Sequence, residues 1–421
     1  MKRTKTTGLQ SDQAARARFL AKHFSDISRK PQVASIEGYA LRIIDITLTP
    51  PLFLDIFRQG DARTTYQTGS RAYTFVKVET DEGITGLCPA SPSPEITALI
   101  LEIYKPQIVG EDPFEVEKIW EKVYWTNYGN VRRGAPVRAL SYIDIAMWDI
   151  IGKACKQPIH RLLGGHRSKV PAYGSGINLP LPIDDLVKQN RMFVEMGFRM
   201  VKMKIGQRDK NEDLRRIKAV RDAVGDDVDV AVDANNMYGV NTAMFMAKKM
   251  ERYDVYWFEE PVLLDNIDGI VRLAKSTSIP IAGYELENTK YGFKELIARG
   301  AIGVCQADAT ICGGITEYRK IAALAECYGV PVAPHGADQI HVPLTAAIPN
   351  GLIVEWMYGL GARNADLIKD PIIPENGEMA CKNVPGLGIE VRDEAFREHG
   401  VKPEGMSIAS MNPRYQWPPY A

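Results

Sequence analysis

The stretch RMVKMKIG, residues 199–206, is followed 29 residues later by VDVAVDAN, residues 228–235, and this repetition predicts the fold. Both are short apolar runs that end in charged side chains, Lys204 in the first and Asp233 in the second. Strand side chains alternate between two faces, so Lys202 and Lys204 point the same way. A half-exposed strand with a solvated lysine face would explain the first run alone, and the runs that follow decide between the interpretations.

Six further runs of this kind extend the series to eight candidate strands. They are VPAYGSG (170–176), VYWFEEP (255–261), IPIAGYE (279–285), GVCQADAT (303–310), PVAPHGA (331–337) and LIVEWMY (352–358). From Asp233 onward, the charged residues at the ends of these runs recur at intervals of 26, 26, 23, 27 and 20 residues. Eight βα units of this length predict a (β/α)8 barrel over residues 166–365. A doubly wound sheet is the alternative, but the sequence has neither GxGxxG nor GxxxxGK[ST].

The residues around the barrel have a different pattern. Strand-like runs precede helical ones over residues 38–165, which predicts a small α+β domain with a β-hairpin at the turn DEGITG. Apolar residues at helical spacing from Ser141 predict a helix that ends at Gly164-Gly165. Residues 1–37 are a basic extension, interpreted as disordered or packed on a partner subunit rather than as a transit peptide. Residues 366–421 are predicted to return to the α+β domain.

The composition excludes several classes of partner. The 421 residues include 52 basic and 52 acidic side chains, so the formal net charge of zero favours neither nucleic acid nor an anionic membrane. We find no apolar run long enough to span a bilayer and no secretory signal. The six cysteines form no CxxC pair, which is typical of reduced cysteines and predicts a cytoplasmic protein.

Charged residues at the strand ends predict the functional site, because a barrel gathers the C-terminal ends of its strands around one mouth. They are Lys202, Lys204, Asp233, Glu259, Glu285, Asp308, His335 and Glu355. Each alone is explained by a helix N-cap, a solvated charge or a core histidine. Their recurrence at successive strand ends favours a shared site.

Three of these residues predict a metal site. Asp233, Glu259 and Glu285 follow adjacent strands, and three converging carboxylates repel one another unless a cation lies among them. Oxygen donors with open coordination positions suit Mg2+. Zinc is disfavoured because no cysteine or histidine joins the three.

The remaining residues predict acid–base chemistry. Two neighbouring ammonium groups and burial should lower the pKa of Lys204 toward that of a general base, while Lys202 would bind a substrate carboxylate. Asp308 should orient His335, which lies on the opposite side of the barrel. Two bases around a metal suit abstraction of a proton next to a carboxylate. The metal and a protonated Glu355 would stabilise the resulting enediolate.

The motifs KMKIG, VDAN, FEEP, GYE, ADATICGG, APHG, VEW and PGLGIE together resemble those of the mandelate racemase subgroup of the enolase superfamily, over residues 38–395. The resemblance implies a capping α+β domain, completed by the C-terminal segment, on a (β/α)8 barrel, and a homo-oligomer between a dimer and an octamer. It implies that Lys204 and His335 are the acid–base residues and Asp308 is the partner of His335. It also implies a hydrogen-bond-donating Glu355, an Mg2+ site at Asp233, Glu259 and Glu285, and a substrate-binding Asn235. Tyr284, where glycine is frequent, is a departure expected to crowd the pocket.

The reaction depends on the carbon next to the abstracted proton. A hydroxyl there can be expelled to give a 2-keto-3-deoxy acid, whereas reprotonation alone gives a racemase or epimerase. Residues 51–71, interpreted as a loop over the substrate, are mostly polar, and Arg63 is predicted to bind the substrate's far end. Mobile surface loops are commonly polar as well.

We therefore predict an Mg2+-dependent dehydratase of an acid sugar, an aldonate or an aldarate. A racemase or epimerase of a 2-hydroxy acid is the alternative, and a cycloisomerase is less favoured. A non-catalytic sugar-acid binder is disfavoured because binding does not need two bases.

Overall fold

The computed structural model describes residues 41–91, 93–401 and 410–411. The basic extension predicted for residues 1–37 lies outside the described residues. No helix in the described part of the chain combines the length and the apolar character needed to cross a bilayer.

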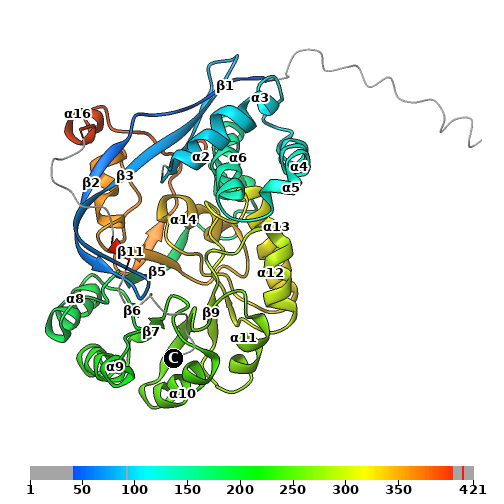
Figure 1. Cartoon of the computed structure of the whole chain (residues 1–421). Helices are drawn as coiled ribbons and strands as arrows, with labels where there is room; N and C mark the ends of the chain where they lie inside the picture. The colour runs from blue at the N-terminus through cyan, green and yellow to red at the C-terminus, as the bar shows by residue number, and fades with distance from the viewer. Residues whose placement is uncertain (1–40, 92, 402–409, 412–421) are drawn as a thin grey trace, which may run out of the picture. The chain divides into compact units, whose positions relative to one another are not determined.

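A closed ring of parallel strands forms the centre of the structure (Figure 1), with strand order β10-β9-β8-β7-β6-β5-β11. The strands are β5 (Lys169–Ser175), β6 (Met200–Lys204), β7 (Asp229–Asp233), β8 (Val255–Glu259), β9 (Ile281–Gly283), β10 (Val304–Cys305) and β11 (Val354–Met357). Val332 closes the ring through parallel bridges to Cys305 and Gly351. This arrangement confirms the predicted barrel.

The run at 331–337 forms only these bridges rather than a full strand. Pro331 and Pro334 carry no N–H group, which leaves Val332 and Ala333 as the donors between them. Their amides donate to the carbonyls of Asn350 and Cys305.

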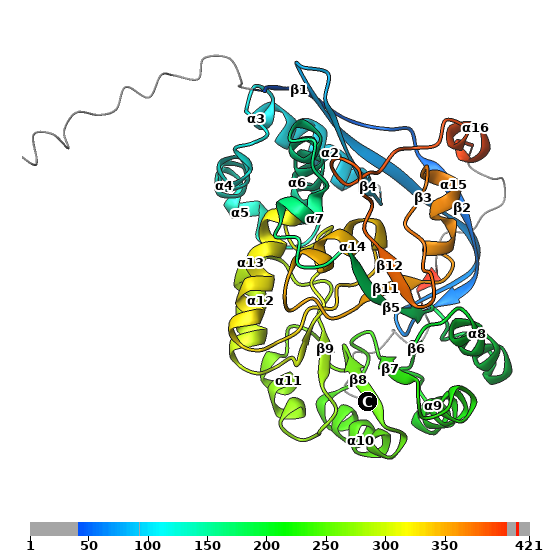
Figure 2. The same cartoon turned by 180° about the vertical axis from the view of Figure 1, so that it is seen from behind.

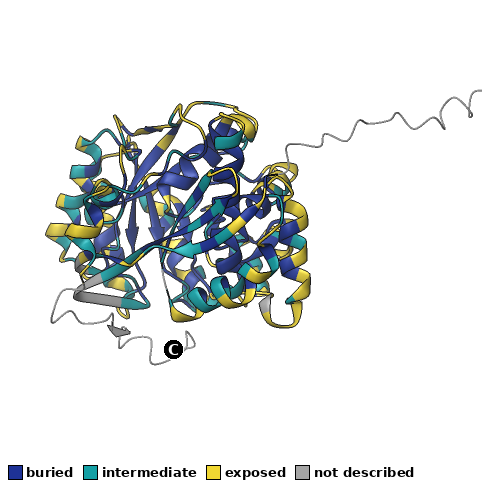
Figure 3. Ribbon diagram, turned by 90° about the horizontal axis from the view of Figure 1, so that it is seen from above, coloured by how far each residue is buried: buried dark blue, intermediate teal, exposed yellow. Residues whose placement is uncertain are grey.

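Helices follow the strands and lie outside the ring. They are α8 (Ile183–Glu195), α9 (Lys210–Val224), α10 (Val240–Met250), η2 (Glu251–Tyr253), α11 (Ile267–Ala274), α12 (Thr289–Ala298), α13 (Gly314–Cys327), α14 (Asp338–Ala347), η3 (Gly361–Arg363) and α15 (Asn364–Leu367). Buried residues are concentrated on the strands, and exposed ones on the outer sides of these helices (Figure 3). The predicted alternation of strand and helix is therefore confirmed.

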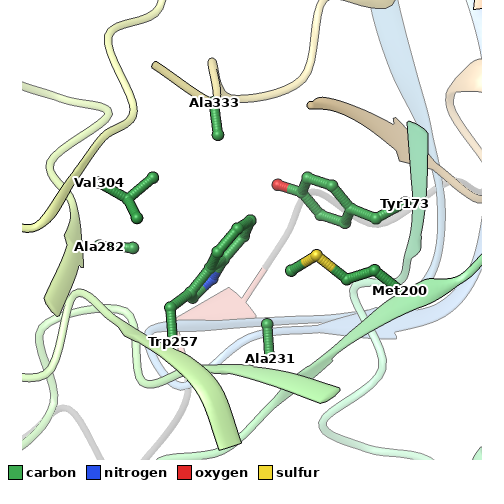
Figure 4. Close-up of a cluster of buried hydrophobic side chains, with 7 residues drawn as sticks. All are labelled: Tyr173, Met200, Ala231, Trp257, Ala282, Val304 and Ala333. Carbon is green, nitrogen blue, oxygen red and sulfur yellow. The ribbon is translucent and has the colours of Figure 1, made fainter. Parts of the chain in front are cut away.

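Two large aromatic side chains and several small side chains fill the inside of the barrel (Figure 4). Trp257 and Tyr173 meet edge to face with ring centroids 5.3 Å apart. Small residues from other strands, among them Ala231 and Ala282, leave room for the two rings. The barrel interior is thus a packed core that supports the strand ends.

The N-terminal part is an antiparallel sheet packed with helices. Its strands are β1 (Ile43–Leu48), β2 (Leu52–Gly60), β3 (Thr64–Thr80) and β4 (Thr85–Ala90). Its helices are α2 (Pro94–Ala98), the π-helix η1 (Leu99–Tyr104), α3 (Lys105–Ile108), α4 (Val116–Thr126), α5 (Tyr128–Val131), α6 (Ala135–Ala154) and α7 (Ile159–Leu162). The hairpin of β3 and β4 forms as predicted.

Two local predictions in this part are wrong. The helix from Ser141 ends at Ala154 instead of at Gly164-Gly165, because Lys156 takes a left-handed conformation and Pro158 disfavours a helical residue before it. Residues 51–71 form β2, the tip of a hairpin and the start of β3 rather than an irregular loop. Leu52 and Leu54 alternate with outward-facing neighbours and are buried, which is a strand signal that the polar residues further on obscured.

The C-terminal segment returns to both parts of the structure. Strand β12 (Glu378–Ala380) pairs antiparallel with β5 (Figure 2). The Leu387 amide donates to Asp149 on α6 at 2.8 Å. Helix α16 (Ala395–His399) follows, and β13 (Ser410–Met411) pairs with β3. From Arg42 onward the chain forms one compact unit, and the boundaries predicted at residues 165 and 365 stay predictions.

Candidate active site

A cavity of about 350 Å³ lies between the N-terminal sheet and the mouth of the barrel. The barrel contributes Lys204, Asn235, Glu285, Asp308, His335 and Glu355 to its wall, all of them predicted site residues. The N-terminal part contributes Leu54, Asp61, Arg63, Arg71, Tyr73, Arg138 and Tyr142. The α+β domain therefore caps the barrel mouth.

The hairpin tip is fixed to the barrel by backbone hydrogen bonds. The Gly60 amide donates to the Ile177 carbonyl at 2.8 Å, and the Leu179 amide donates back to Gly60 at 3.0 Å. Asp61 accepts the amides of Arg63 and Thr64 at 2.7 Å, a turn that aspartate favours. These contacts place Arg63 at the cavity.

His335 and Asp308 form the predicted pair. The imidazole Nδ1 lies 2.9 Å from Asp308 Oδ2, and its Nε2 lies 3.4 Å from Glu285 Oε2. Burial lowers the pKa of His335, but Glu285 and the hydrogen bond to Asp308 outweigh it and raise the pKa to about 10. Thr310 donates its amide and its hydroxyl to the other Asp308 oxygen, both at 2.7 Å. The charged imidazole is therefore held in one orientation.

The predicted lowering of the lysine pKa values is wrong for this structure. Burial lowers the pKa of Lys204, but the ion pair with Asp233 outweighs it and leaves the pKa above its usual value. The pKa of Lys202 is raised well above its usual value, because Glu259 and Glu355 outweigh burial. The sequence interpretation counted the charge of the second lysine and omitted the carboxylates of the neighbouring strands.

Lys202 lies beneath the cavity wall rather than in it. Its side chain is 1% exposed, and its ammonium lies 2.5 Å from Glu259 Oε1 and 2.9 Å from Glu355 Oε1. Binding to a substrate carboxylate would require Lys202 to leave these two partners. In this structure Lys202 neutralises buried carboxylates instead of lining the substrate cavity.

The pKa of Glu355 is lowered in this structure, whereas its predicted role as a protonated donor requires a raised pKa, so that role stays a prediction. Burial raises its pKa, but Lys202 and His335 outweigh burial and lower the pKa below its usual value. Its Oε2 accepts the Gly336 amide at 2.8 Å, which holds the loop after His335. An ionised carboxylate accepts hydrogen bonds and donates none.

The three predicted metal ligands come from consecutive strands and have cations between them. Asp233 pairs with Lys204, Glu259 pairs with Lys202, and Glu285 Oε1 lies 3.9 Å from Arg63. Within the described ranges, no three His, Cys, Asp or Glu side chains have the spacing of a metal site.

The chemistry of these donors nevertheless fits a divalent cation. Burial and the negative charge of Asp233 raise the pKa of Glu259 to about 8, because together they outweigh the opposing effect of Lys202. Burial raises the pKa of Asp233, but Lys204 and Lys202 outweigh burial and lower the pKa to about 2. Buried carboxylates that depend on cations in this way suit a hard metal ion with oxygen ligands.

Arg63, Asn235 and Tyr284 complete the predicted residues. Arg63 lines the cavity, with its guanidinium 3.5 Å from Asp61. Asn235 also lines it and donates its amide to Asp233 at 2.8 Å, while its side-chain oxygen accepts no hydrogen bond from any described residue. Tyr284 does not crowd the cavity as predicted, because its hydroxyl donates to the Val262 carbonyl at 3.0 Å in the interior.

Several supporting residues were missed. The Trp257 indole and the Gln306 amide donate to Glu259 at 3.0 and 2.8 Å. His341 accepts the Ala309 amide at Nε2, and its Nδ1 lies 2.6 Å from the Gly336 carbonyl, so it joins the loops that carry Asp308 and His335. Gln306 lies two residues before Asp308, where strand alternation could have revealed it. His341 lies on an apolar helix that resembles ordinary core.

Comparison with known protein families identifies the family of this chain. Residues 59–164 match the mandelate racemase / muconate lactonizing enzyme N-terminal domain, and residues 185–395 match the enolase C-terminal domain-like family. The chain belongs to the mandelate racemase/muconate lactonizing enzyme family. This membership of the enolase superfamily confirms the resemblance inferred from the motifs.

Relatives within this family catalyse more than one reaction. The arabinonate dehydratase of Saccharolobus solfataricus is 35% identical over 77% of this chain and 90% of its own. The D-galactarolactone cycloisomerase of Agrobacterium fabrum is 34% identical over 78% of this chain and 91% of its own. The structure of L-talarate/galactarate dehydratase from Salmonella typhimurium LT2, liganded with Mg and L-lyxarohydroxamate, matches with a TM-score of 0.78. It is 30% identical and covers 89% of this chain and 95% of that one.

Proposed function

We propose that this enzyme dehydrates a sugar acid, an aldonate or an aldarate, to a 2-keto-3-deoxy acid with Mg2+ as its cofactor. The observation that supports this reaction most directly is that Lys204 and His335 line one cavity together with Glu285. The names of the dehydratases among the relatives favour the same class of reaction. The enzyme is then a hydro-lyase.

The proposed cofactor site is formed by three carboxylates, of which Glu285 lies in the cavity wall. Asp233, Glu259 and Glu285 would hold Mg2+, which would supply positive charge opposite the substrate carboxylate. Magnesium in the structure of a family relative supports the choice of ion. Asn235 and Arg63 would then orient the substrate from the cavity wall, since the side-chain oxygen of Asn235 accepts no hydrogen bond from a described residue.

The proton transfers belong to Lys204 and His335. Although burial lowers the pKa of Lys204, the ion pair with Asp233 raises it above its usual value, so Lys204 must lose this partner and its proton before it can act as a base. Neutral Lys204, or His335 once it has also lost its proton, then takes the proton from C2, and the electrons of the C–H bond form an enediolate. His335, charged and oriented by Asp308, gives its Nε2 proton to the departing C3 hydroxyl, which leaves as water. The enol that remains takes a proton at C3 and becomes the 2-keto-3-deoxy acid.

A second candidate rests on the same two groups. If the substrate has no hydroxyl at C3, one group removes the C2 proton and the other returns a proton to the opposite face. This gives a racemase or epimerase of a 2-hydroxy acid. Homo-oligomer formation and a cytoplasmic location stay predictions from the sequence.

Proton NMR in D2O tests the proposal, with the full chain, Mg2+ and a panel of stereoisomeric aldonates and aldarates. Loss of the C2 signal together with a deuterated C3 methylene signal is expected for dehydration. Exchange at C2 without a methylene signal would instead identify the racemase or epimerase. If every compound stays unchanged, the proposed reaction on sugar acids is wrong.

A further inference from the structure

Two arginines on the capping side of the cavity have no acidic partner among the residues that the structure describes. Arg71 on β3 and Arg138 on α6 both line the cavity. Neither guanidinium forms an ion pair with a carboxylate in the described part of the chain, whereas most other charged groups of the wall are paired. An arginine in a partly enclosed wall is stabilised by an anion, and a carboxylate accepts its two parallel N–H groups.

A tyrosine and a serine place the two arginines in one wall. Arg71 donates to the Ser91 hydroxyl at 3.3 Å and lies over the Tyr73 ring, 5.7 Å from its centroid. The Ser91 amide donates to the Tyr142 hydroxyl at 3.5 Å. Arg138 precedes Tyr142 by four residues on α6, which puts both side chains on one face of the helix. Burial raises the pKa of Tyr142 to about 12, and the positive charge of Arg138 opposes this rise. Arg71, Ser91, Tyr142 and Arg138 thus form a continuous polar surface, called here the arginine wall.

The other cation of the capping side is already neutralised. Arg63 lies between Asp61 and Glu285, 3.5 and 3.9 Å from their oxygens. A second substrate carboxylate at Arg63 would therefore compete with two protein carboxylates. Arg63 is left to bind hydroxyl groups, and its predicted contact with the substrate's far end stays a prediction.

We propose that the arginine wall binds a second carboxylate at the end of the substrate away from the barrel, so that the substrate is an aldarate rather than an aldonate. This inference rests on the proposed dehydration of a sugar acid. One carboxylate faces Lys204 and His335 in the barrel mouth, and the other faces Arg71 and Arg138 across the cavity. The relatives leave this choice open, since they include dehydratases of arabinonate, a monoacid, and of galactarate, a diacid.

The test uses matched compounds that differ only at C6. The complete set of six-carbon aldarates and the aldonates of the same configuration are compared with the full-length protein in Mg2+. Calorimetry gives the dissociation constants, and proton NMR gives the rates of dehydration. The variants are Arg138→Met and Arg71→Met, and Arg161→Met on the exposed side of α7 is the control, since Arg161 lies outside the cavity wall.

We expect the wild type to prefer one aldarate over its aldonate by at least about 30-fold, in binding and in kcat/KM. Arg138→Met should remove most of this preference, because it weakens binding of the aldarate and not of the aldonate. Arg161→Met should keep the preference. Arg138→Lys should restore part of it, because a lysine keeps the charge and loses the paired geometry.

Each other outcome is informative about one of the two proposals. Two outcomes overturn the arginine wall as a carboxylate site and leave the proposed dehydratase reaction unaffected. In the first, an aldonate is bound and dehydrated as well as its aldarate. In the second, both arginine variants keep the preference for the aldarate. An aldarate that binds through Arg138 without being dehydrated supports the arginine wall and contradicts the proposed reaction. Absence of binding across the complete set overturns both.

Discussion

His335 and Asp308 form an ion pair at the barrel mouth, in which 2.9 Å separates the imidazole Nδ1 from the carboxylate Oδ2. The remaining ring nitrogen, Nε2, is directed toward Glu285 at the cavity wall. The contact with Asp308 thus leaves Nε2 as the ring nitrogen of His335 that is available for the proposed proton transfer.

Replacing Asp308 with asparagine should slow dehydration by about 100-fold or more, because a positioned acid–base group contributes 10²–10⁴-fold. The asparagine keeps the size of the side chain but loses the charge that stabilises the imidazolium. Rates of product formation by wild type and Asp308→Asn measure the effect. Asp227→Asn, at an exposed turn, should keep the wild-type rate. Equal rates for all three proteins would show that Asp308 has no part in the reaction.

Replacing His335 with asparagine should separate the two proton transfers. Dehydration should stop, because the acid that protonates the C3 hydroxyl is missing. Exchange of the C2 proton with D2O should continue, since Lys204 lines the same cavity. Proton NMR follows both signals in one sample. Dehydration that persists in this variant would rule out His335 as the required acid.

Mg2+ should stabilise the folded protein. Three buried carboxylates from consecutive strands are held here by lysine and arginine side chains, and a bound ion would take over part of this role. Saturation to about 100 times Kd corresponds to about 2.7 kcal/mol of stabilisation. Thermal unfolding with and without a chelator measures it. Glu259→Gln should reduce the response to Mg2+, whereas Glu102→Gln on the surface should retain it. A Tm unaffected by Mg2+ would contradict the proposed ligands.

Trp257 connects the barrel core to the site, because its indole N–H donates to Glu259 at 3.0 Å. Trp257→Phe should lower the free energy of unfolding by about 1–3 kcal/mol, because the buried Glu259 carboxyl loses one of its hydrogen bonds. Tyr173→Phe is the matched control, since the Tyr173 hydroxyl is buried in the same core and accepts or donates no hydrogen bond among the described residues. Denaturant unfolding compares them. Equal losses in the two variants would show that packing alone matters.

The sequence predicts the barrel and most of the site because both depend on periodicity. Charged residues at regular intervals identify the strand ends, and barrel geometry alone brings Lys204, Glu285 and His335 to one cavity. Side-chain partners do not follow from intervals. The pairing of Lys204 with Asp233 depends on how neighbouring strands are staggered, so the shift of the Lys204 pKa was predicted with the wrong sign.

The capping side was harder to predict for a different reason. Its contribution comes from residues far apart in sequence, such as Arg71 on β3 and Arg138 on α6, with no motif around either. Polar residues near Arg63 suggested a loop, although hydrogen bonds to β3 make this stretch a hairpin. Pairing between distant strands determines such a region, and local patterns describe it poorly.

Stability should depend on pH through Asp144, which lies on α6 and contacts α13 in the interior. Its side chain is fully buried and accepts the Thr316 amide at 3.0 Å and the Thr316 hydroxyl at 2.5 Å. Burial outweighs these hydrogen bonds and raises the pKa of Asp144 from 3.8 to about 7. Between these two values the folded chain holds a proton that the unfolded chain has lost. The contribution of Asp144 to stability is therefore full below about pH 4 and is lost as the pH rises toward 7.

Asp144→Asn removes the titrating group and keeps an oxygen that can accept one of the Thr316 hydrogen bonds. Between pH 4 and 7 the free energy of unfolding of the wild type should fall relative to that of Asp144→Asn. The expected fall is a few kcal/mol, since each unit of pKa shift corresponds to about 1.4 kcal/mol. Denaturant unfolding of both proteins across this range, with Asp227→Asn as the exposed control, measures the difference. Parallel pH profiles for wild type and Asp144→Asn would show that Asp144 is ionised in the folded protein, so that its hydrogen bonds from Thr316 outweigh burial.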